Sequence, residues 1–248
     1  MKAEYRKGCL QRDSVERKED VGVQSAEARE GNKRDSAETL LDEILSRRNL
    51  NQAYDKVKSK KGAPGIDGMT VGAALPWLME HGKELKQSIR EGRYKPNPVR
   101  QVMIPKPDGS GERKLGIPTV IDRVIQLAIA QKLQPIYEPL FADQSYGYRP
   151  GRNCQKAMKK VKEHVDQGYV HVAEIDLSKY FDTINHELLI NMLREQIQDV
   201  EVINLIKKYV KSGVMVNGVV VETEEGSPQG GPLSPLLASI YREQYDQE

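Results

Sequence analysis

A short hydrophobic run that ends in a carboxylate constrains the fold of this chain more than any other feature. Residues Tyr169–Leu177 are mostly apolar, and Asp176 stands near their end. Such a run predicts a buried strand followed by a turn. A strand end holds a carboxylate rigidly, and the backbone carbonyl of Ile175 can add a second hard oxygen ligand for Mg²⁺. We therefore predict that Asp176 and Ile175 bind a metal; the alternative is that Asp176 only caps the following turn.

The charge of the chain is unevenly distributed, although the formal net charge is only +2. Residues Lys83–Lys114 hold nine Lys or Arg against four acids, and Lys132–Lys162 hold seven against two. Residues Glu174–Glu201 reverse this balance, with seven acids against two bases. Basic flanks around an acidic centre suit a protein that grips a phosphate backbone and holds divalent cations. Charged helix faces in water are the alternative.

Several functional classes find no support in the sequence. No run approaches the roughly 20 apolar residues of a membrane span, and Met1–Asp20 is too charged for a signal peptide, so we expect a cytoplasmic protein. Cys9 and Cys154 have neither metal spacing nor a disulfide framework. The histidines are scattered without metal spacing, and we assign them no chemistry: His81, His164, His171 and His186.

The chain divides into a polar leader and one ordered domain. Residues 1–36 mix acids and bases with almost no aromatic side chains, which predicts a flexible segment. Residues 37–248 carry the apolar periodicity of a folded domain. Within this domain the spacing predicts helices at Leu40–Leu45, Asn51–Lys60, Ala73–Arg93, Val120–Leu133, Asn153–Val165 and Ile203–Val210, and one that starts near Leu233.

Two hairpins complete the predicted architecture. Residues Val99–Pro105 and Arg113–Ile117 have strand character and flank a Pro-Asp-Gly-Ser-Gly turn. Asn217-Gly218, between valine-rich runs, predicts a second, tight hairpin. Helices and short strands thus alternate without internal repeats, so we expect an α+β fold with mixed helices and a small antiparallel sheet.

Three loops have compositions that allow a ligand or another backbone to approach closely. Residues Lys61–Gly68 contain three glycines and a proline. Residues Ser145–Arg152 cluster tyrosine with arginine, which can bind phosphate and stack on sugars or bases. Residues Gly226–Pro235 contain three glycines and three prolines, which makes a stiff turn. Taken singly, each segment can also be an ordinary loop.

In order and spacing, these segments resemble the reverse transcriptases encoded by group II introns, over about Lys61 to Ser239. The strand that ends at Asp176 resembles the first palm motif, and Ser-Pro-Gln-Gly within Gly226–Pro235 resembles the Pro-Gln-Gly motif. Ile104–Gly109 with Arg113–Thr119 resembles the fingers hairpin. The glycine-rich loop at Lys61–Gly68 resembles an insertion that precedes the fingers in this branch. The resemblance implies fingers joined to a partial palm.

At the nucleotide, the resemblance implies specific roles. Asp176 corresponds to the first catalytic aspartate. Phe181 corresponds to the aromatic residue that packs under the incoming sugar and excludes a ribose 2′-hydroxyl, with ordinary core packing as the alternative. Lys106 and Arg113 correspond to side chains that face the triphosphate, with solvated surface charge as the alternative. Gln229 corresponds to the residue near the nucleotide site.

At the nucleic acid, the resemblance implies contacts from two further segments. Arg149 corresponds to a template or nucleotide contact, and the alternative is an internal ion pair that stabilises the start of a helix. Gly65 and Gly68 lie in the loop that contacts template strands in the family.

The implied activity is RNA-directed DNA polymerisation, with Mg²⁺ as cofactor and with an RNA template, intron RNA, a DNA primer and deoxynucleoside triphosphates as partners. The family continues to a Tyr-Ala-Asp-Asp hairpin that supplies further carboxylates. This sequence contains no Tyr-Ala-Asp-Asp motif. We therefore expect a truncated domain that polymerises little by itself. An incomplete palm sheet would leave an exposed edge, which predicts self-association or a partner chain.

Two other functions are compatible with the same sequence. One is an RNA-binding, maturase-like module without polymerase activity, because the family's fingers bind intron RNA without catalytic aspartates. The other is a reverse transcriptase linked to a CRISPR or retron system, which normally lacks the glycine-rich insertion together with this fingers sequence.

Overall fold

The computed structural model describes residues 38–106, 109, 111–177, 180–216, 218–222, 225–226 and 230–246. The predicted leader, residues 1–36, lies outside the described residues, as do Asn217 and Gln229. The α-helices are α1 (Leu40–Ile44), α2 (Arg47–Ser59), α3 (Val71–Arg90), α4 (Val120–Tyr137), α5 (Cys154–Asp166), α6 (His186–Gln196), α7 (Val200–Val210) and α8 (Ser234–Asp246). The strands are β1 (Val99–Pro105), β2 (Glu112–Ile117), β3 (Val214–Val216) and β4 (Val219–Val221).

Helix starts are set by polar caps. In seven of the described helices, a Ser, Thr, Asn or Asp side chain accepts a hydrogen bond from a backbone N–H of the first turn, which satisfies a donor that has no partner within the helix. These caps are Thr39, Ser46, Thr70, Thr119, Asn153, Asn185 and Asp199. They lengthen α2, α3 and α7 at their N-termini beyond the predicted spans.

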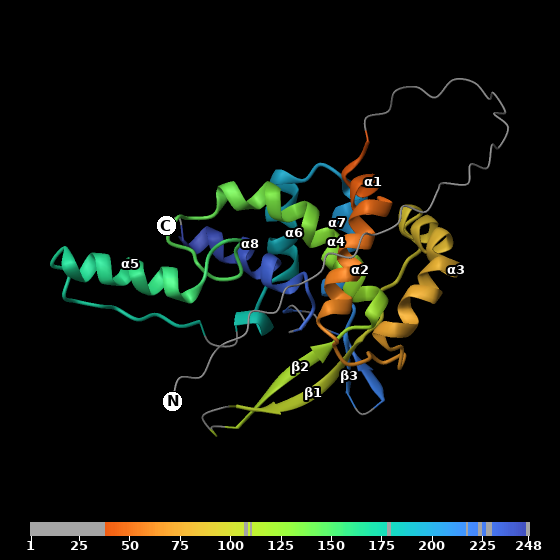
Figure 1. Cartoon of the computed structure of the whole chain (residues 1–248), viewed down its shortest axis with the longest axis horizontal. Coiled ribbons are helices and arrows are strands. Elements are labelled where there is room, and N and C mark those ends of the chain that lie inside the picture. Colours follow the sequence, from red (N-terminus) through yellow and green to blue (C-terminus); the bar gives the residue numbers. More distant parts are fainter. Residues whose placement is uncertain are drawn as a thin grey trace, which may run out of the picture. The chain divides into compact units, whose positions relative to one another are not determined.

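Helix α4 forms the centre of the hydrophobic core. Its side chains are buried on several faces, and it packs against α1, α2, α3 and α8. Helix α6 packs against α7 and α8. Figure 1 shows these helices gathered together, while the β1–β2 hairpin extends away from them. The fold therefore presents the hairpin on a rigid helical base.

The sheet has the strand order β2-β1-β3-β4. Strands β1 and β2 pair antiparallel, with Ile104 opposite Arg113, and β3 pairs antiparallel with β4. Strands β1 and β3 pair in parallel, with Val99 opposite Val214. A parallel pair requires a long connection, and residues 106–213, which include β2 and helices α4, α5, α6 and α7, provide it. The α+β prediction and both hairpins are confirmed, and the sheet is mixed because of its one parallel pair.

The predicted buried strand at Tyr169–Leu177 is wrong. This segment has no regular secondary structure, and its side chains are exposed, including Val172 at 85% and Ile175 at 88%. A single extended segment cannot satisfy its backbone groups or bury apolar side chains without neighbouring strands. The four paired strands of the described chain do not include it.

Helix α5 also lacks a cover. It has no buried residue, and the apolar side chains of Met158, Val161 and Val165 are all at least half exposed. In Figure 1 it stands apart from the helical core and leads into the exposed Tyr169–Leu177 segment. Exposed apolar side chains therefore recur along this part of the chain, from Met158 to Leu177.

Candidate nucleotide and nucleic-acid site

The β1–β2 hairpin presents two of the predicted nucleotide contacts. Lys106 follows β1, and its backbone N–H donates to the carbonyl of Gly111 at 2.8 Å, which continues the ladder beyond the strand. Arg113 lies on β2 opposite Ile104. Both side chains are exposed, and within the described residues neither forms an ion pair. Two exposed cations that no described acid pairs with can bind a polyphosphate.

Gly230, in the middle of the Pro-Gln-Gly loop (Gly226–Pro235), lies against the base of this hairpin. A Cβ atom at Gly230 would overlap the carbonyl oxygen of Gly116 and lie 3.1 Å from the Cδ1 of Leu115. Gly230 also has a φ of +114°, so this position requires glycine on two grounds. Leu115 and Arg113 are two residues apart on β2 and share one face of the strand. The loop therefore contacts the hairpin face that carries Arg113.

The start of the same loop lies against the turn that carries Phe181. Gly226 has a φ of +87°, and a Cβ atom there would lie 2.9 Å from the carbonyl oxygens of Phe181 and Asp182. The turn itself is a single 3₁₀ segment, Tyr180–Asp182, in which Phe181 is half-buried. The Tyr180 hydroxyl donates to the Ala238 carbonyl of α8 at 2.7 Å. The loop thus bridges the hairpin base and this turn, with Gln229 between the two contacts in sequence.

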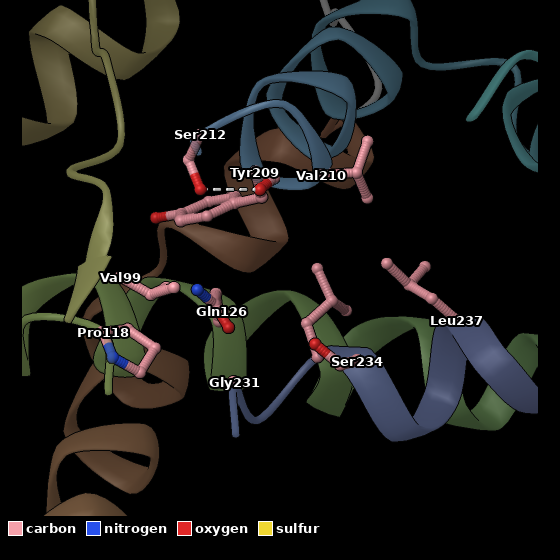
Figure 2. Close-up of a pocket in the computed structure, with 10 residues that line it drawn as sticks. Val99, Pro118, Gln126, Tyr209, Val210, Ser212, Gly231, Ser234 and Leu237 are labelled. Carbon is pink, nitrogen blue, oxygen red and sulfur yellow. Dashed lines mark hydrogen bonds between the residues drawn. The ribbon is translucent and has the colours of Figure 1, made fainter. Parts of the chain in front are cut away.

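A small cavity lies under the C-terminal end of the loop. Figure 2 shows Gly231 and Ser234 on one side of it, with Tyr209 and Ser212 across from them and Gln126 between. Its volume is about 10 Å³, which is room for about one water molecule. The cavity is therefore a packing gap between the loop, α4 and α7, and it is too small to hold a nucleotide.

The glycine-rich loop at residues 61–68 is anchored to the start of α4. Gly65 is buried, and a Cβ atom there would lie 2.6 Å from the Cα of Thr119, so the two backbones touch. The guanidinium of Arg123 donates to the Ala63 carbonyl at 2.6 Å. Gly68 is exposed, with a φ of +68° and open space around it. Gly65 therefore fixes the loop in place, whereas Gly68 is accessible.

A buried carboxylate that the sequence analysis missed ties the base of the hairpin to the helices. Asp122, in the first turn of α4, is 1% exposed and accepts hydrogen bonds from the Thr119 hydroxyl at 2.7 Å and the Tyr94 hydroxyl at 2.5 Å. Asn97 and the Tyr209 hydroxyl add further donors. Thr119 three residues before Asp122, just ahead of an apolar helix, is a capping signal that could have identified this carboxylate.

The pKa values of the two tyrosines that neighbour Asp122 are raised. Burial, and then the Asp122 carboxylate, raise the pKa of Tyr94 well above its usual range. Burial likewise raises the pKa of Tyr209, with further contributions from Tyr94 and Asp122. Both phenols are therefore held neutral, as donors to the carboxylate.

Arg149 forms contacts inside the protein. Its side chain is 4% exposed, pairs with Glu138 at 2.9 Å, and donates to the carbonyls of Ala142, Ser145 and Glu138 at 2.6, 3.1 and 3.2 Å. It also lies over the ring of Phe141. These contacts match the alternative given for Arg149 in the sequence analysis, an internal ion pair that stabilises the start of a helix.

Asp176 and Ile175 are exposed in the Tyr169–Leu177 segment, apart from any strand end. The described residues include no group of three or more His, Cys, Asp or Glu side chains that could hold a metal ion. A carboxylate and a backbone carbonyl are nevertheless the hard oxygen donors that Mg²⁺ prefers. The donor chemistry of this pair fits Mg²⁺, while the rigid placement that we predicted for it is absent.

Comparison with known proteins gives the family. Residues 104–248 match the model of the reverse transcriptase (RNA-dependent DNA polymerase) family. The chain is similar to a solved chain of a Cas6-RT-Cas1–Cas2 complex, with a TM-score of 0.57 and 25% identity, over 85% of this chain and 35% of that one. The chain belongs to the reverse transcriptase family, and its helices, hairpin and mixed sheet form part of that fold.

Within this family the chain is similar to proteins encoded by group II introns. It is 40% identical over 194 residues to the group II intron-encoded protein LtrA of Lactococcus lactis, which covers 78% of this chain and 32% of LtrA. It is 40% identical to the protein YkfC of Escherichia coli, over 80% of this chain and 53% of YkfC. A putative COX1/OXI3 intron 2 protein of Saccharomyces cerevisiae is 34% identical, over 87% of this chain and 25% of that protein. The chain thus spans about a third to a half of the two bacterial relatives.

Proposed function

We propose that this chain is the nucleotide- and template-binding part of an RNA-directed DNA polymerase of the group II intron type, which acts in reverse transcription, intron mobility and RNA splicing. One observation carries the proposal. The Pro-Gln-Gly loop bridges the base of the cationic hairpin and the Tyr180–Asp182 turn, with glycines at both contacts. The loop thereby links three segments that are far apart in the sequence, and we propose that the nucleotide binds beside them.

At that place, each side chain has a chemical role that its position supports. The exposed Arg113 guanidinium can hold two phosphate oxygens in a fork, and Lys106 adds a point charge. Phe181 offers a half-buried ring as a surface for the sugar. Gln229, within the bridging loop, is assigned to the nucleotide by the family motif.

Magnesium, when bound, supplies the positive charge that stabilises the phosphates during in-line transfer. We assign Asp176 and the Ile175 carbonyl as ligands from this chain. Because both lie on an exposed, unpaired segment, we propose that they become fixed only when that segment is covered by further protein or by nucleic acid.

Template contacts are assigned to the glycine-rich loop. Gly68 offers accessible backbone, and Gly65 keeps the loop on α4. We keep Arg149 as a positioning residue for the Ser145–Arg152 segment, since its guanidinium has internal partners. An RNA template, intron RNA, a DNA primer and deoxynucleoside triphosphates are the proposed ligands, and the cytoplasm is the proposed compartment. The described residues contain no helix that is long and apolar enough to span a membrane.

The test is templated nucleotide binding by the whole chain. A fluorescent RNA–DNA primer–template is bound to the protein in Mg²⁺, and each deoxynucleoside triphosphate is titrated in. We expect the nucleotide that matches the template base to bind at least about tenfold more tightly than a mismatched one, which corresponds to about 1.4 kcal/mol. Equal binding of all four nucleotides would contradict the proposal.

A second candidate function, RNA binding without polymerisation, is favoured by the surface of α2. This helix and the residues after it present exposed cations against one acid, Asp55. The cations are Arg47, Arg48, Lys56, Lys58, Lys60 and Lys61. Such a surface neutralises phosphates without reading bases. Tight, salt-sensitive binding of structured RNA with no preference for the matched nucleotide would support this function instead.

A further inference from the structure

His186 is a buried histidine to which neither the sequence analysis nor the proposed function gives a role. It is the first residue of α6 and is 3% exposed. Its Nε2 lies 2.6 Å from the carbonyl oxygen of Gly226, the first residue of the Pro-Gln-Gly loop. A carbonyl only accepts hydrogen bonds, so Nε2 carries the hydrogen and donates it.

Gly226 is held from three directions at once. Its N–H donates to the Ile184 carbonyl at 2.8 Å, and its carbonyl accepts from His186. Its α-carbon lies so close to the carbonyls of Phe181 and Asp182 that no side chain fits. Glu225, the preceding residue, forms a β-bridge with Asn185. Of these contacts, the His186 bond is the one made by a side chain, and substitution can therefore remove it.

The other ring nitrogen of His186 adds an independent observation. Nδ1 is buried and has no hydrogen-bond partner among the described residues. A hydrogen on Nδ1 would find no acceptor there, so the hydrogen on Nε2, which the Gly226 carbonyl accepts, fits the site. The ring is thus committed to a single hydrogen bond, the one to the loop.

We propose that His186 is a positioning residue that fixes the start of the Pro-Gln-Gly loop on the Tyr180–Asp182 turn. It thereby holds Gly226, at the start of the loop, against the turn that carries Phe181. The link to nucleotide binding rests on the proposed function, whereas the anchoring of the loop does not.

The experiment uses two variants of the full chain. His186→Leu keeps a similar volume and removes the donor, while His186→Gln keeps an N–H donor at a similar reach. His164→Leu, at an exposed position on α5, is the matched control. Hydrogen–deuterium exchange is measured on peptides that cover residues 225–231 and, for comparison, Val200–Val210 in α7. The affinity for the matched nucleotide on a primer–template is measured alongside.

In His186→Leu we expect exchange in residues 225–231 to be at least about tenfold faster, with α7 unchanged, since one anchoring hydrogen bond is lost. Matched-nucleotide affinity should fall by about tenfold, and both effects should be largely restored in His186→Gln. The control should behave like the wild type.

Unchanged exchange in residues 225–231 of a folded His186→Leu protein would overturn the anchoring. Faster exchange with unchanged nucleotide affinity would overturn the positioning role. If the wild-type chain shows no preference for the matched nucleotide, the proposed function fails, and the exchange data decide the anchoring separately.

Discussion

Arg149 shows how one side chain can organise a loop. Its guanidinium binds one carboxylate and three backbone carbonyls between Glu138 and Ser145, and these contacts hold the segment that follows α4. The motif around Arg149 predicts a nucleic-acid contact by family resemblance. Sequence alone could not decide between this role and internal pairing, because both require an arginine at the same position.

Replacing Arg149 by Met should destabilise the protein by about 3 kcal/mol, because Glu138 and three carbonyls lose their donor inside the protein. The free energy of unfolding in urea measures the effect. Arg152→Met is the matched control, since the Asp143 carboxylate of its ion pair is 96% exposed and the loss should stay under about 1 kcal/mol. Equal losses in the two variants would contradict the internal role.

The tyrosines around Asp122 predict a pH dependence of stability. The pKa values of Tyr94 and Tyr209 are raised in the folded protein, so the folded state holds their protons more tightly than the unfolded state does. This contribution is fully present below about pH 10, the usual tyrosine pKa, and is lost as the pH rises above it. The free energy of unfolding should therefore fall above about pH 10.

Urea unfolding at pH 8 and at pH 10.5 checks this expectation. Tyr94→Phe should weaken the alkaline fall, because one of the buried tyrosines that hold their protons in the folded state is gone. Tyr148→Phe, at an exposed position, should leave the slope as in the wild type. A slope that is the same in all three proteins would rule out the Asp122 cluster as its source.

At the scale of elements, local signals determined most of the fold. Apolar periodicity located α4, and alternation with turn residues located both hairpins. Helix α6 was absent from the predicted elements, although Asn185 before a Leu-rich run is a readable cap. The strand prediction for Tyr169–Leu177 was wrong for another reason. The composition of this segment favours a strand, but a strand forms only where neighbouring strands pair with it and bury it. The local sequence does not show whether such neighbours are present.

The exposure of this segment can be tested by substitution. Ile175→Ser should change the free energy of unfolding by less than about 0.5 kcal/mol, because the Ile175 side chain is already in solvent. Ile190→Ala in α6, where the side chain is 0% exposed, should cost about 2–5 kcal/mol. A loss at Ile175 that approached the loss at Ile190 would mean that the segment is the buried strand that the sequence predicts.

At the scale of the whole molecule, the chain exposes several apolar surfaces. Helix α5, the Tyr169–Leu177 segment and the edge strand β4 all present apolar side chains to solvent, including Val219, Val220 and Val221 of β4. An exposed edge strand and uncovered apolar side chains favour association. Asp176 lies in one of these surfaces, the Tyr169–Leu177 segment, so what covers that segment bears on the proposed metal ligands.

We predict that the purified chain self-associates as its concentration rises from about 1 to 100 μM, a range in which exposed apolar surface promotes association. Sedimentation velocity follows the change in mass. Val161→Glu with Val172→Glu should shift association to higher concentration, whereas Lys159→Glu, on the polar side of α5, should not. A compact monomer across the whole range would refute this expectation.

The most direct test of the account compares nucleotide binding with RNA binding in one variant. Lys106→Ala with Arg113→Ala is titrated with the matched deoxynucleoside triphosphate on a primer–template, and separately with structured RNA. We predict that nucleotide affinity falls by about 100-fold, from the loss of two charge-assisted contacts, while affinity for the RNA stays within about threefold. An unchanged nucleotide affinity, or equal losses for both ligands, would contradict a nucleotide site at this hairpin.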